Sequence, residues 1–247
     1  MRYEAWAPHY ARLRDALGYP FAREEASARR LVEHLPPEAR EDPLGRLGAR
    51  LRGRDVVVAG LAPGAGPPPV WRLPRSAPSA AIVAADGAAA ACLAAGLVPD
   101  VITTDLDGPV PAEIEANLRG SLVVVHAHGD NAPAIDEWVP QFPGALAGSW
   151  AGPPRDGLLD VGGFTDGDRA AYLADELGAH QILLWGFDFE TTDATDPAER
   201  ARKLAKLAWA RTVLALLARE GTSPLYLWQR DGRRVPYPAG IAAESTR

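Results

Sequence analysis

The chain lacks several features on which whole classes of protein depend. It contains a single cysteine, Cys92, so no internal disulfide can form, which is typical of a reducing compartment. Cys92 lies in an alanine-rich segment, where we interpret it as a small core residue rather than a nucleophile. No apolar stretch reaches the roughly 18 residues that a membrane span needs, and the first residues lack the apolar core of an export signal. The sequence therefore predicts a cytoplasmic protein that does not enter a membrane.

Lysine is also scarce. It occurs only at Lys203 and Lys206, and the formal net charge of the chain is −6. This balance argues against a protein that coats nucleic acid, because such proteins need a basic face. A nucleotide could still bind, provided that metal ions offset its charge. The residues that are present, 47% apolar and 23% charged, are typical of an ordinary folded domain.

The order of the apolar runs indicates how the chain is organised. Residues 1–52 are predicted to form a helical N-terminal cap, residues 53–222 an α/β domain, and residues 223–247 a tail with a possible edge strand. Strands and helices alternate in the α/β domain, which predicts a mostly parallel, Rossmann-like sheet flanked by helices. The stretches 60–78 and 145–157 are expected to be long loops. We expect strands at 55–59, 80–85, 100–103, 121–125, 158–161 and 180–185, and helices at 86–96, 111–119, 131–140, 166–178 and 196–220.

Each predicted strand of this domain leads into a loop rich in Asp, Gly or His. In a parallel sheet the carboxyl ends of the strands lie on one edge, where ligands bind. The loop with the most specific motif contains Asp105 and Asp107, two carboxylates separated by one residue that can hold Mg²⁺. Asp86 adds a third carboxylate at the neighbouring strand end. The alternative for all three is an aspartate-rich turn or a helix cap.

A second loop carries two histidines. The motif His126-Ala127-His128-Gly129-Asp130-Asn131 follows the predicted strand 121–125. His126, His128 and Asp130 could hold a transition metal, as in zinc hydrolases, but neither a cysteine nor a clear third histidine accompanies them. A role for His128 as a donor to a phosphate oxygen fits these residues better. A purely structural strand-to-helix turn is the other alternative.

Two glycine-rich loops are candidate phosphate sites. The motif from Gly162 to Arg169 opens a predicted helix, so its backbone amides, Thr165 and the helix N-terminus favour an anion. Arg169 could bind a phosphate with two N–H groups. Residues 60–66 resemble a phosphate cradle but lack the Gly-Lys-Ser/Thr ending of a Walker A loop, so a flexible connector is equally compatible.

Three more residues are candidates for nucleotide or substrate contacts. Lys203 and Lys206 lie in the predicted helix 196–220 and could reach phosphates, although such a helix can equally present them to solvent. Asp188 lies between two phenylalanines and could bond an amino group of a stacked heterocycle. A helix cap beside core aromatic residues is the alternative for Asp188.

Several of these motifs together resemble a known family. Asp86-Gly87-Ala88, Gly96-Leu97-Val98-Pro99-Asp100 and Thr104-Asp105-Leu106-Asp107-Gly108 are similar to the metal-binding half of thiamin diphosphokinases. The later motifs, from His126 onward to Lys203-Leu204-Ala205-Lys206-Leu207, resemble the archaeal type of 6-hydroxymethyl-7,8-dihydropterin diphosphokinase, over roughly residues 55–217 in all. The first loop and the Gly148-Ser149-Trp150 segment depart from that family's pattern.

The resemblance implies a Mg²⁺-dependent transfer of diphosphate from ATP to 6-hydroxymethyl-7,8-dihydropterin, which yields AMP and the pterin diphosphate. Such an enzyme serves folate or methanopterin-type cofactor synthesis, and its partners are ATP and a reduced pterin, with a homo-oligomer left open. The residues implied are Asp86, Asp105 and Asp107 for the metal, Asp107, His128 and Arg169 for catalysis, Gly60, Gly64, Thr165, Asp166, Asp168, Lys203 and Lys206 for the nucleotide, and Asn131 and Asp188 for the pterin.

Three alternatives are weighed against this interpretation. A thiamin diphosphokinase would share the aspartates but would need an apolar pocket for the thiazole ring. A metal-dependent hydrolase would use the His-x-His motif. A non-catalytic nucleotide-binding module would keep the glycine loops but would not need the strand-end aspartates, all of which are present.

Overall fold

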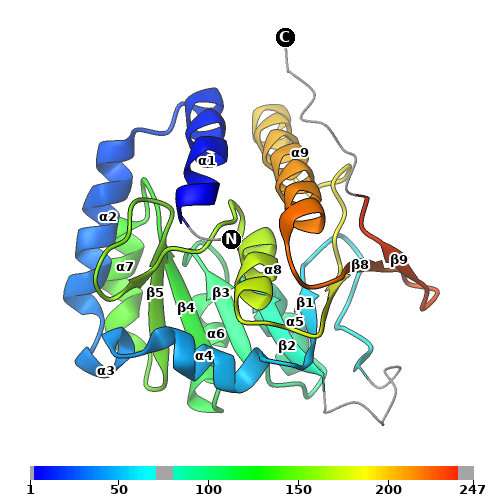
Figure 1. Ribbon diagram of the computed structural model, residues 1–247, viewed down its shortest axis with the longest axis horizontal. Helices are drawn as coiled ribbons and strands as arrows, with labels where there is room; N and C mark the ends of the chain where they lie inside the picture. The colour runs from blue at the N-terminus through cyan, green and yellow to red at the C-terminus, as the bar shows by residue number, and fades with distance from the viewer. Residues whose placement is uncertain (1–2, 71–79, 239–247) are drawn as a thin grey trace.

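A computed structural model describes residues 3–70 and 80–238 of the chain. Within these residues, nine strands form one sheet in the order β6-β5-β4-β3-β2-β1-β7-β8-β9 (Figure 1). All neighbouring pairs are parallel except β8 and β9. The mostly parallel α/β sheet predicted from the sequence is confirmed. The strands are β1 (Asp55–Ala59), β2 (Ala81–Ala85), β3 (Val101–Thr104), β4 (Leu122–Ala127), β5 (Leu146–Trp150), β6 (Leu158–Leu159), β7 (Gln181–Trp185), β8 (Leu225–Trp228) and β9 (Arg234–Pro236).

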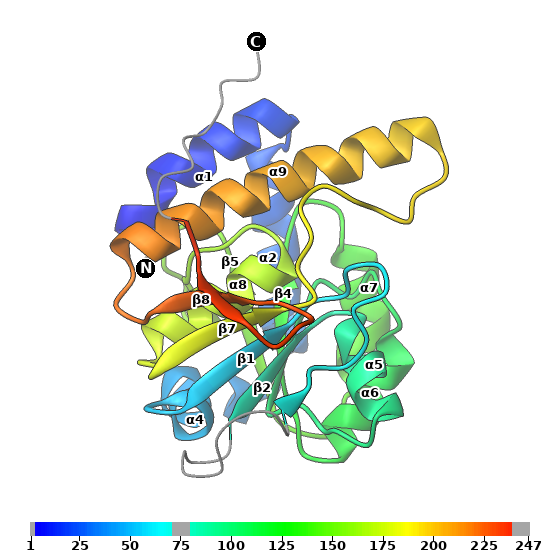
Figure 2. The same cartoon turned by 90° about the vertical axis from the view of Figure 1, so that its right-hand side faces the viewer.

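Helices cover both faces of the sheet (Figure 2). Apolar side chains from one set share a core with one sheet face; this set contains α1 (Tyr3–Leu17), α4 (Pro43–Leu51), α8 (Asp166–Glu176) and α9 (Pro197–Glu220). The other set packs on the opposite face and contains α2 (Phe21–His34), α3 (Pro37–Arg40), α5 (Ala88–Ala94), α6 (Val110–Leu118) and α7 (Ala132–Trp138), which continues into the 3₁₀ turn η2 (Val139–Gln141). The N-terminal helices are therefore divided between both layers.

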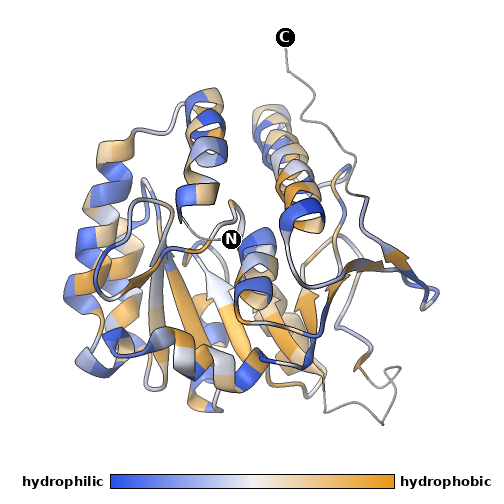
Figure 3. Cartoon of the chain, viewed as in Figure 1, coloured by the Kyte–Doolittle hydropathy of each residue, from blue (hydrophilic) through white to orange (hydrophobic). Residues whose placement is uncertain are grey.

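The central strands are apolar on both sides because both sides are covered. Every residue of β1, β3 and β4 is buried, which explains why these strands read as nearly continuous apolar runs. Figure 3 shows the hydrophobic strands inside and hydrophilic residues along the outer helices. None of the helices in the described part of the chain combines the length and apolarity needed to cross a membrane.

The stretch 145–157 differs from the expectation that it is a loop. Its first part forms β5, whose five residues are all buried and pair with β4 on one side and β6 on the other. The sequence Leu146-Ala147-Gly148-Ser149-Trp150 has small residues where a strand usually shows large apolar ones. Large side chains do not fit at the centre of β5, because even a Cβ on Gly148 would lie 2.5 Å from Leu158 and 2.6 Å from Leu35.

Residues 60–69 of the other expected loop contain neither a helix nor a strand, whereas residues 71–79 lie outside the described part. The predicted strand 158–161 is reduced to the two residues of β6 at the edge of the sheet. In the tail, β8 pairs with β7 and β9 forms the opposite edge.

The chain reverses its direction across the sheet at β1. From β1 to β6 each new strand is added on the same side, and β7 then returns to the other side of β1. A crevice forms at such a switch point, beyond the carboxyl ends of the strands. Here the loops after β1 and β7 touch, because the Gly60 N–H donates to the Trp185 carbonyl at 2.8 Å and the Ala62 N–H to the Gly186 carbonyl at 2.9 Å. A Cβ on Gly60 would lie 2.7 Å from the Gly186 oxygen, so only glycine allows this approach.

Candidate active site

A pocket of about 400 Å³ lies at the carboxyl ends of the strands, where the switch point predicts it. Its walls come from the strand-end loops, from the loop before α9 and α9 itself, and from the two N-terminal helices α1 and α2. Of the residues proposed from the sequence, the pocket is lined by Gly60, Asp86, Asp105, Asp107, His128, Thr165, Asp166, Arg169, Asp188, Lys203 and Lys206.

Three aspartates at two neighbouring strand ends face this pocket. Asp86 follows β2, and Asp105 and Asp107 follow β3. Asp86 has φ +44°, and Leu106, between the other two, has φ +69°. These left-handed conformations are rare for residues other than glycine and are concentrated at functional sites. The backbone around the carboxylates is therefore held in a shape that the residues do not themselves favour.

The three carboxylates act on one another's charge. Burial in the pocket and the charges of Asp105 and Asp86 raise the pKa of Asp107 to about 6. Burial also raises the pKa of Asp86. Although burial acts in the same direction on Asp105, the hydrogen bond and charge of His128 hold the pKa of Asp105 below its ordinary value. Asp166, at the start of α8, has a pKa well above its ordinary value because of burial and the charge of Asp105.

The donor set fits a hard divalent cation. Among residues 3–70 and 80–238, no three acidic, histidine or cysteine side chains converge closely enough to hold a metal ion by themselves. Mg²⁺ commonly takes only one or two protein carboxylates and keeps water or substrate phosphates as its other ligands. Asp86, Asp105 and Asp107 are therefore suited to a magnesium site that a phosphorylated substrate completes.

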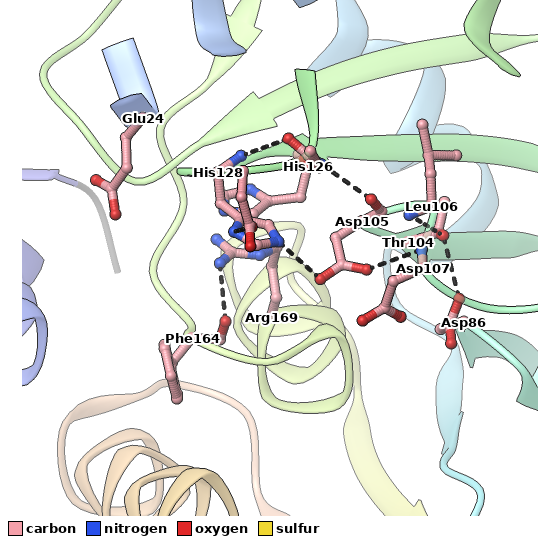
Figure 4. A network of polar contacts seen from close by, with 12 residues as sticks. Glu24, Asp86, Thr104, Asp105, Leu106, Asp107, His126, His128, Phe164 and Arg169 are labelled. Carbon is pink, nitrogen blue, oxygen red and sulfur yellow. Dashed lines mark hydrogen bonds and ion pairs between the residues drawn. The ribbon is translucent and has the colours of Figure 1, made fainter. Parts of the chain in front are cut away.

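The two histidines at the end of β4 have different partners: the strand extends to Ala127, so His126 lies within it and His128 directly follows it. Nδ1 of His126 lies 3.1 Å from the Ser149 hydroxyl, and burial keeps the pKa of His126 well below its ordinary value. Nε2 of His128 lies 2.9 Å from a carboxylate oxygen of Asp105 (Figure 4). The rings stack with their centroids 6.3 Å apart, and Nδ1 of His128 lies 3.4 Å from the exposed carboxylate of Asp130. Among the described residues these side chains do not converge into a group of three that could hold a metal ion. This arrangement does not favour the transition-metal hydrolase alternative.

Arg169 is a buried cation with unused donors. Its side chain is 2% exposed, and Nη2 donates to the Phe164 carbonyl at 3.3 Å. Its Nε and Nη1 atoms have no hydrogen-bond partner within the described part of the chain. Buried N–H donors without acceptors are costly, so an anionic ligand at this point would satisfy both the charge and the remaining hydrogen bonds of Arg169.

Comparison with known proteins places the chain in a family. Residues 70–194 match the family model described as 6-hydroxymethylpterin diphosphokinase MptE-like. A 6-hydroxymethyl-7,8-dihydropterin pyrophosphokinase of Methanothermobacter thermautotrophicus is 34% identical over 92% of this chain and 100% of its own length. The protein of that name from Pyrococcus furiosus is 36% identical over 91% of this chain and 98% of its own length. This chain belongs to that family.

Membership confirms the family resemblance seen in the motifs and, at the level of the family, the class of diphosphotransferases. These relatives do not support the thiamin alternative. Among solved structures, the monofunctional α-2,3-sialyltransferase Cst-I of Campylobacter jejuni aligns with 73% of this chain and 77% of its own, with a TM-score of 0.43 and 12% identity. That similarity is too low to bear on function.

Three residues that the family resemblance assigned to ligands lie behind the pocket wall or beside it: Gly64, Asn131 and Asp168. Both N–H groups of the Asn131 amide are engaged, by the carbonyls of Asp105 at 2.9 Å and His126 at 2.7 Å. Its oxygen accepts the His128 N–H at 3.0 Å. Asn131 thus joins the two loops that carry the acidic cluster and the histidines.

Asp168 is fully buried and stabilises the start of α8. Its carboxylate accepts a hydrogen bond from the N–H of Phe164. It also accepts hydrogen bonds from the N–H and from the hydroxyl of Thr165, both at 3.0 Å. This is a capping box, and it fixes the first turn of α8, from which Arg169 reaches into the site. A direct contact of Asp168 with a nucleotide stays a prediction that this geometry does not favour.

At the other end of the pocket, Asp188 accepts hydrogen bonds from the N–H of Glu190 at 2.8 Å and from the Thr191 hydroxyl at 2.6 Å. These bonds shape the loop that leads to α9. Lys203 lies 3.3 Å from Glu199 and 3.4 Å from Asp193, and the charge of Lys206 acts on Asp107. Both of the chain's lysines therefore face the same pocket as the acidic cluster.

Sequence reasoning missed two buried glutamates at the site. Glu24 in α2 lines the pocket and is 3% exposed, and Glu113 in α6 is fully buried beside Asp86. A signal did exist in both cases, because each glutamate lies on the buried face of its helix at a spacing of three or four residues. The buried residues are Glu24, Ser27, Ala28 and Leu31 in α2, and Val110, Glu113, Ala116 and Asn117 in α6.

Proposed function

We propose that this protein transfers a diphosphoryl group from ATP to the hydroxymethyl oxygen of 6-hydroxymethyl-7,8-dihydropterin, with Mg²⁺ as its cofactor and AMP as the second product. The reaction would take place in the cytoplasm, in the synthesis of a folate or methanopterin-type cofactor. One observation carries the proposal: the carboxylates of Asp86, Asp105 and Asp107 line one pocket together with Arg169, whose Nε and Nη1 have no hydrogen-bond partner among the described residues, in a chain that belongs to this family.

The reaction forms one P–O bond and breaks another. The hydroxymethyl oxygen of the pterin attacks the β-phosphorus of ATP, the bond from that phosphorus to the α-phosphate oxygen breaks, and AMP leaves. The hydroxyl proton is released to solvent. Little covalent chemistry is asked of the protein, so catalysis consists of positioning and of offsetting negative charge.

Asp86, Asp105 and Asp107 would hold the metal. A bound Mg²⁺ offsets the charge of the triphosphate and of the group in transfer. The His128 ring, which lies 2.9 Å from Asp105, keeps that carboxylate in place. Arg169 would contact the transferred phosphates through Nε and Nη1, and His128 is a second candidate donor to them.

The nucleotide would lie toward the loop after β1 and α9. Gly60 brings backbone N–H groups close to the β7 loop, and Thr165 lies at the N-terminus of α8, where an anion is favoured. Lys203 and Lys206 would act on the phosphates from α9. Gly64, Asp166 and Asp168 were also implied for the nucleotide, and of these only Asp166 lines the pocket.

The decisive experiment identifies the nucleotide product. Purified protein is incubated with ATP, Mg²⁺ and the dihydropterin, and nucleotides are separated by chromatography. We expect AMP and a pterin diphosphate, no turnover in EDTA, and little turnover with thiamin. Formation of ADP would rule out diphosphoryl transfer.

A second assay separates this proposal from the hydrolase alternative. Exhaustive treatment with a zinc-selective chelator should leave the Mg²⁺-supported activity intact, because His126 and His128 serve Ser149 and Asp105. Stoichiometric zinc whose content tracks activity would contradict the phosphate role given to these histidines.

A further inference from the structure

The end of the pocket formed by the N-terminal helices contains a buried carboxylate with one unused oxygen. Oε1 of Glu24 accepts a hydrogen bond from the Tyr10 hydroxyl at 2.5 Å. Oε2 is buried and has no hydrogen-bond partner among the described residues. Burial raises the pKa of Glu24, against the opposing effects of Tyr10 and of the positive charge of Arg14. Leaving such an oxygen unsatisfied is costly, which points to a ligand that supplies the missing donors.

This carboxylate lies on the far side of the phosphate-binding groups from the proposed nucleotide end. In Figure 4, Glu24 is on one side of His128 and Arg169, and the aspartates are on the other. Two aromatic side chains line the same end of the pocket. The rings of Tyr19 and Phe164 have their centroids 6.5 Å apart. A carboxylate next to aromatic rings suits a flat heterocycle that carries hydrogen-bond donors along one edge.

A reduced pterin has such an edge. Its 2-amino-4-oxopyrimidine ring presents a ring N–H and an exocyclic amino group side by side, both as donors. A carboxylate can accept two parallel N–H groups at once, as it does from a guanidinium. The Glu24 carboxylate retains enough acceptor capacity for this pair while it holds the Tyr10 hydroxyl.

We propose that Glu24 recognises the pyrimidine edge of the pterin and that Tyr10 holds the Glu24 carboxylate in position for this contact. The identity of the substrate rests on the function proposed above, whereas the choice of residue rests on the unused buried oxygen. The assignment also gives the N-terminal helices a direct part in the site. Asn131 and Asp188, which the resemblance implied for the pterin, already have other hydrogen-bond partners.

The primary test is Glu24→Gln, analysed by steady-state kinetics. The amide keeps the size of the side chain and can still accept from Tyr10, but it loses the charge and half of the acceptor capacity. Losing a charge-assisted contact predicts a rise in the KM for the pterin of roughly 10- to 100-fold. The kcat and the KM for ATP should stay close to wild type. Calorimetric titration with the pterin, in the presence of Mg²⁺ and α,β-methylene-ATP, should show the same loss without turnover.

Removal of the donor from the ligand provides an independent test. A pterin analogue without the 2-amino group should bind wild-type protein at least 10-fold more weakly, whereas Glu24→Gln should discriminate much less between the two ligands. Equal discrimination by both proteins would overturn the contact. Tyr10→Phe, which keeps the ring, should raise the KM for the pterin by a smaller factor. The matched control is Glu33→Gln, which removes the same charge from an exposed side chain of α2 and should change neither constant.

The outcomes separate this inference from the proposed function. If the wild-type protein makes no AMP from ATP and the dihydropterin, the proposed function fails whatever Glu24 does. If it makes AMP, and Glu24→Gln folds with an unchanged KM for the pterin, the assignment of Glu24 is wrong and the function stands. If Glu24→Gln does not fold, the analogue with wild-type protein and the Tyr10→Phe variant still decide the question.

Discussion

Asp107 lies in the field of two other carboxylates, Asp105 and Asp86, and its raised pKa of about 6 records their charge as well as its burial. The surrounding backbone leaves these residues little freedom. A Cβ on Gly108 would lie 2.3 Å from both carboxylate oxygens of Asp86, so this glycine leaves room for the neighbouring acid. The cluster is thus assembled at some cost in repulsion and strain, which is typical of a site that a ligand completes.

Replacing either β3-loop carboxylate tests the metal site. Asp105→Asn and Asp107→Asn keep the side-chain size and remove one charge each. We expect turnover to fall by about 10²–10³ or more in each variant, because a well-placed electrostatic group commonly has that effect. Thermal stability should be unchanged or higher for Asp107→Asn, since repulsion is relieved, and lower for Asp105→Asn, since the carboxylate that His128 stabilises is lost. Added Mg²⁺ should partly restore activity in both variants. Near-normal turnover in both variants at limiting Mg²⁺ would show that these residues only shape a turn. Asp231→Asn, in the distant β8–β9 hairpin, is the control.

The buried Glu113 predicts a pH-dependent stability. Burial and the charge of Asp86 raise the pKa of Glu113 from 4.5 to about 9. Between pH 4.5 and about pH 9, Glu113 is therefore protonated in the folded protein and ionised in the unfolded chain, so that folding takes up a proton. As the pH rises through this range, Glu113 lowers the free energy of unfolding by up to about 1.4 kcal/mol per pH unit. In thermal denaturation with EDTA, Glu113→Gln should match wild type near pH 5 and become increasingly more stable toward pH 9.

The control for this measurement lies on the same helix. Glu115 is exposed and pairs with Arg119 at 3.3 Å, so Glu115→Gln should give a melting curve against pH that runs parallel to wild type. A parallel curve for Glu113→Gln as well would mean that Glu113 keeps an ordinary pKa in the folded protein.

The sequence identified the candidate residues that follow strand ends but missed two buried glutamates on helices, Glu24 and Glu113. Asp86, Asp105 and His128 meet because parallel strands bring their carboxyl ends to one edge, a rule that needs no side-chain detail. Glu24 required knowledge of which helix face is buried and of what it is buried against. That information lies in contacts between residues far apart in the chain.

At the scale of elements, β5 shows the limit of reading strands from hydrophobicity. Its centre is made of small residues because α2, α3 and β6 pack closely over it. The strands β1 and β7 were predicted almost to the residue, because large β-branched and aliphatic side chains fill the space under the helices. The prediction for β4 ended two residues early, at Val125, and so placed His126 in a loop. A buried strand can therefore be predicted from hydrophobicity only where the space around it is large enough for large apolar side chains.

The space over β5 is testable with Gly148→Ala. The new methyl group would meet Leu158 and Leu35 closer than any Cβ contact normally allows, so neighbouring side chains must move. We expect a loss of about 1–3 kcal/mol in the free energy of unfolding, measured by chemical denaturation. Gly129→Ala is the matched control for stability, because its Cβ would have ordinary contacts at 3.8 and 3.9 Å. Equal stability of the two variants would show that the core at β5 is looser than the structure indicates.

At the scale of the whole molecule, the proposed function requires an acidic protein to bind a polyanion. The net charge is −6, and the pocket itself concentrates aspartates. The binding of a nucleotide is therefore expected to depend on a divalent cation more strongly than on any single side chain. Under the proposed function, we expect the binding of the metal and the binding of the nucleotide to strengthen each other.

This coupling predicts a conditional stabilisation. With Mg²⁺, α,β-methylene-ATP at 100 times its Kd should stabilise the folded protein by about 2.7 kcal/mol, which raises the Tm by roughly 5–10 °C for a chain of this size. With EDTA the same nucleotide should give a shift close to zero. Differential scanning fluorimetry measures both shifts, with Mg²⁺ alone as the reference. Equal stabilisation in EDTA would mean that the lysines and Arg169 suffice to bind the triphosphate.

The position of Glu24 and Tyr10 near the start of the chain has a consequence for biosynthesis. The N-terminal helices meet partners that are translated much later: Arg30 pairs with Asp136, Glu25 with Arg155, and Trp6 packs against Tyr172. On the ribosome, the first helices to emerge must therefore wait, with their apolar faces unburied, until more than 100 further residues have followed. Long-range closure of this kind slows folding and lengthens exposure to aggregation and to chaperones. A nascent chain released before α8 would contain Glu24 but would lack Arg169 and the capping box at the start of α8, which form part of the same pocket.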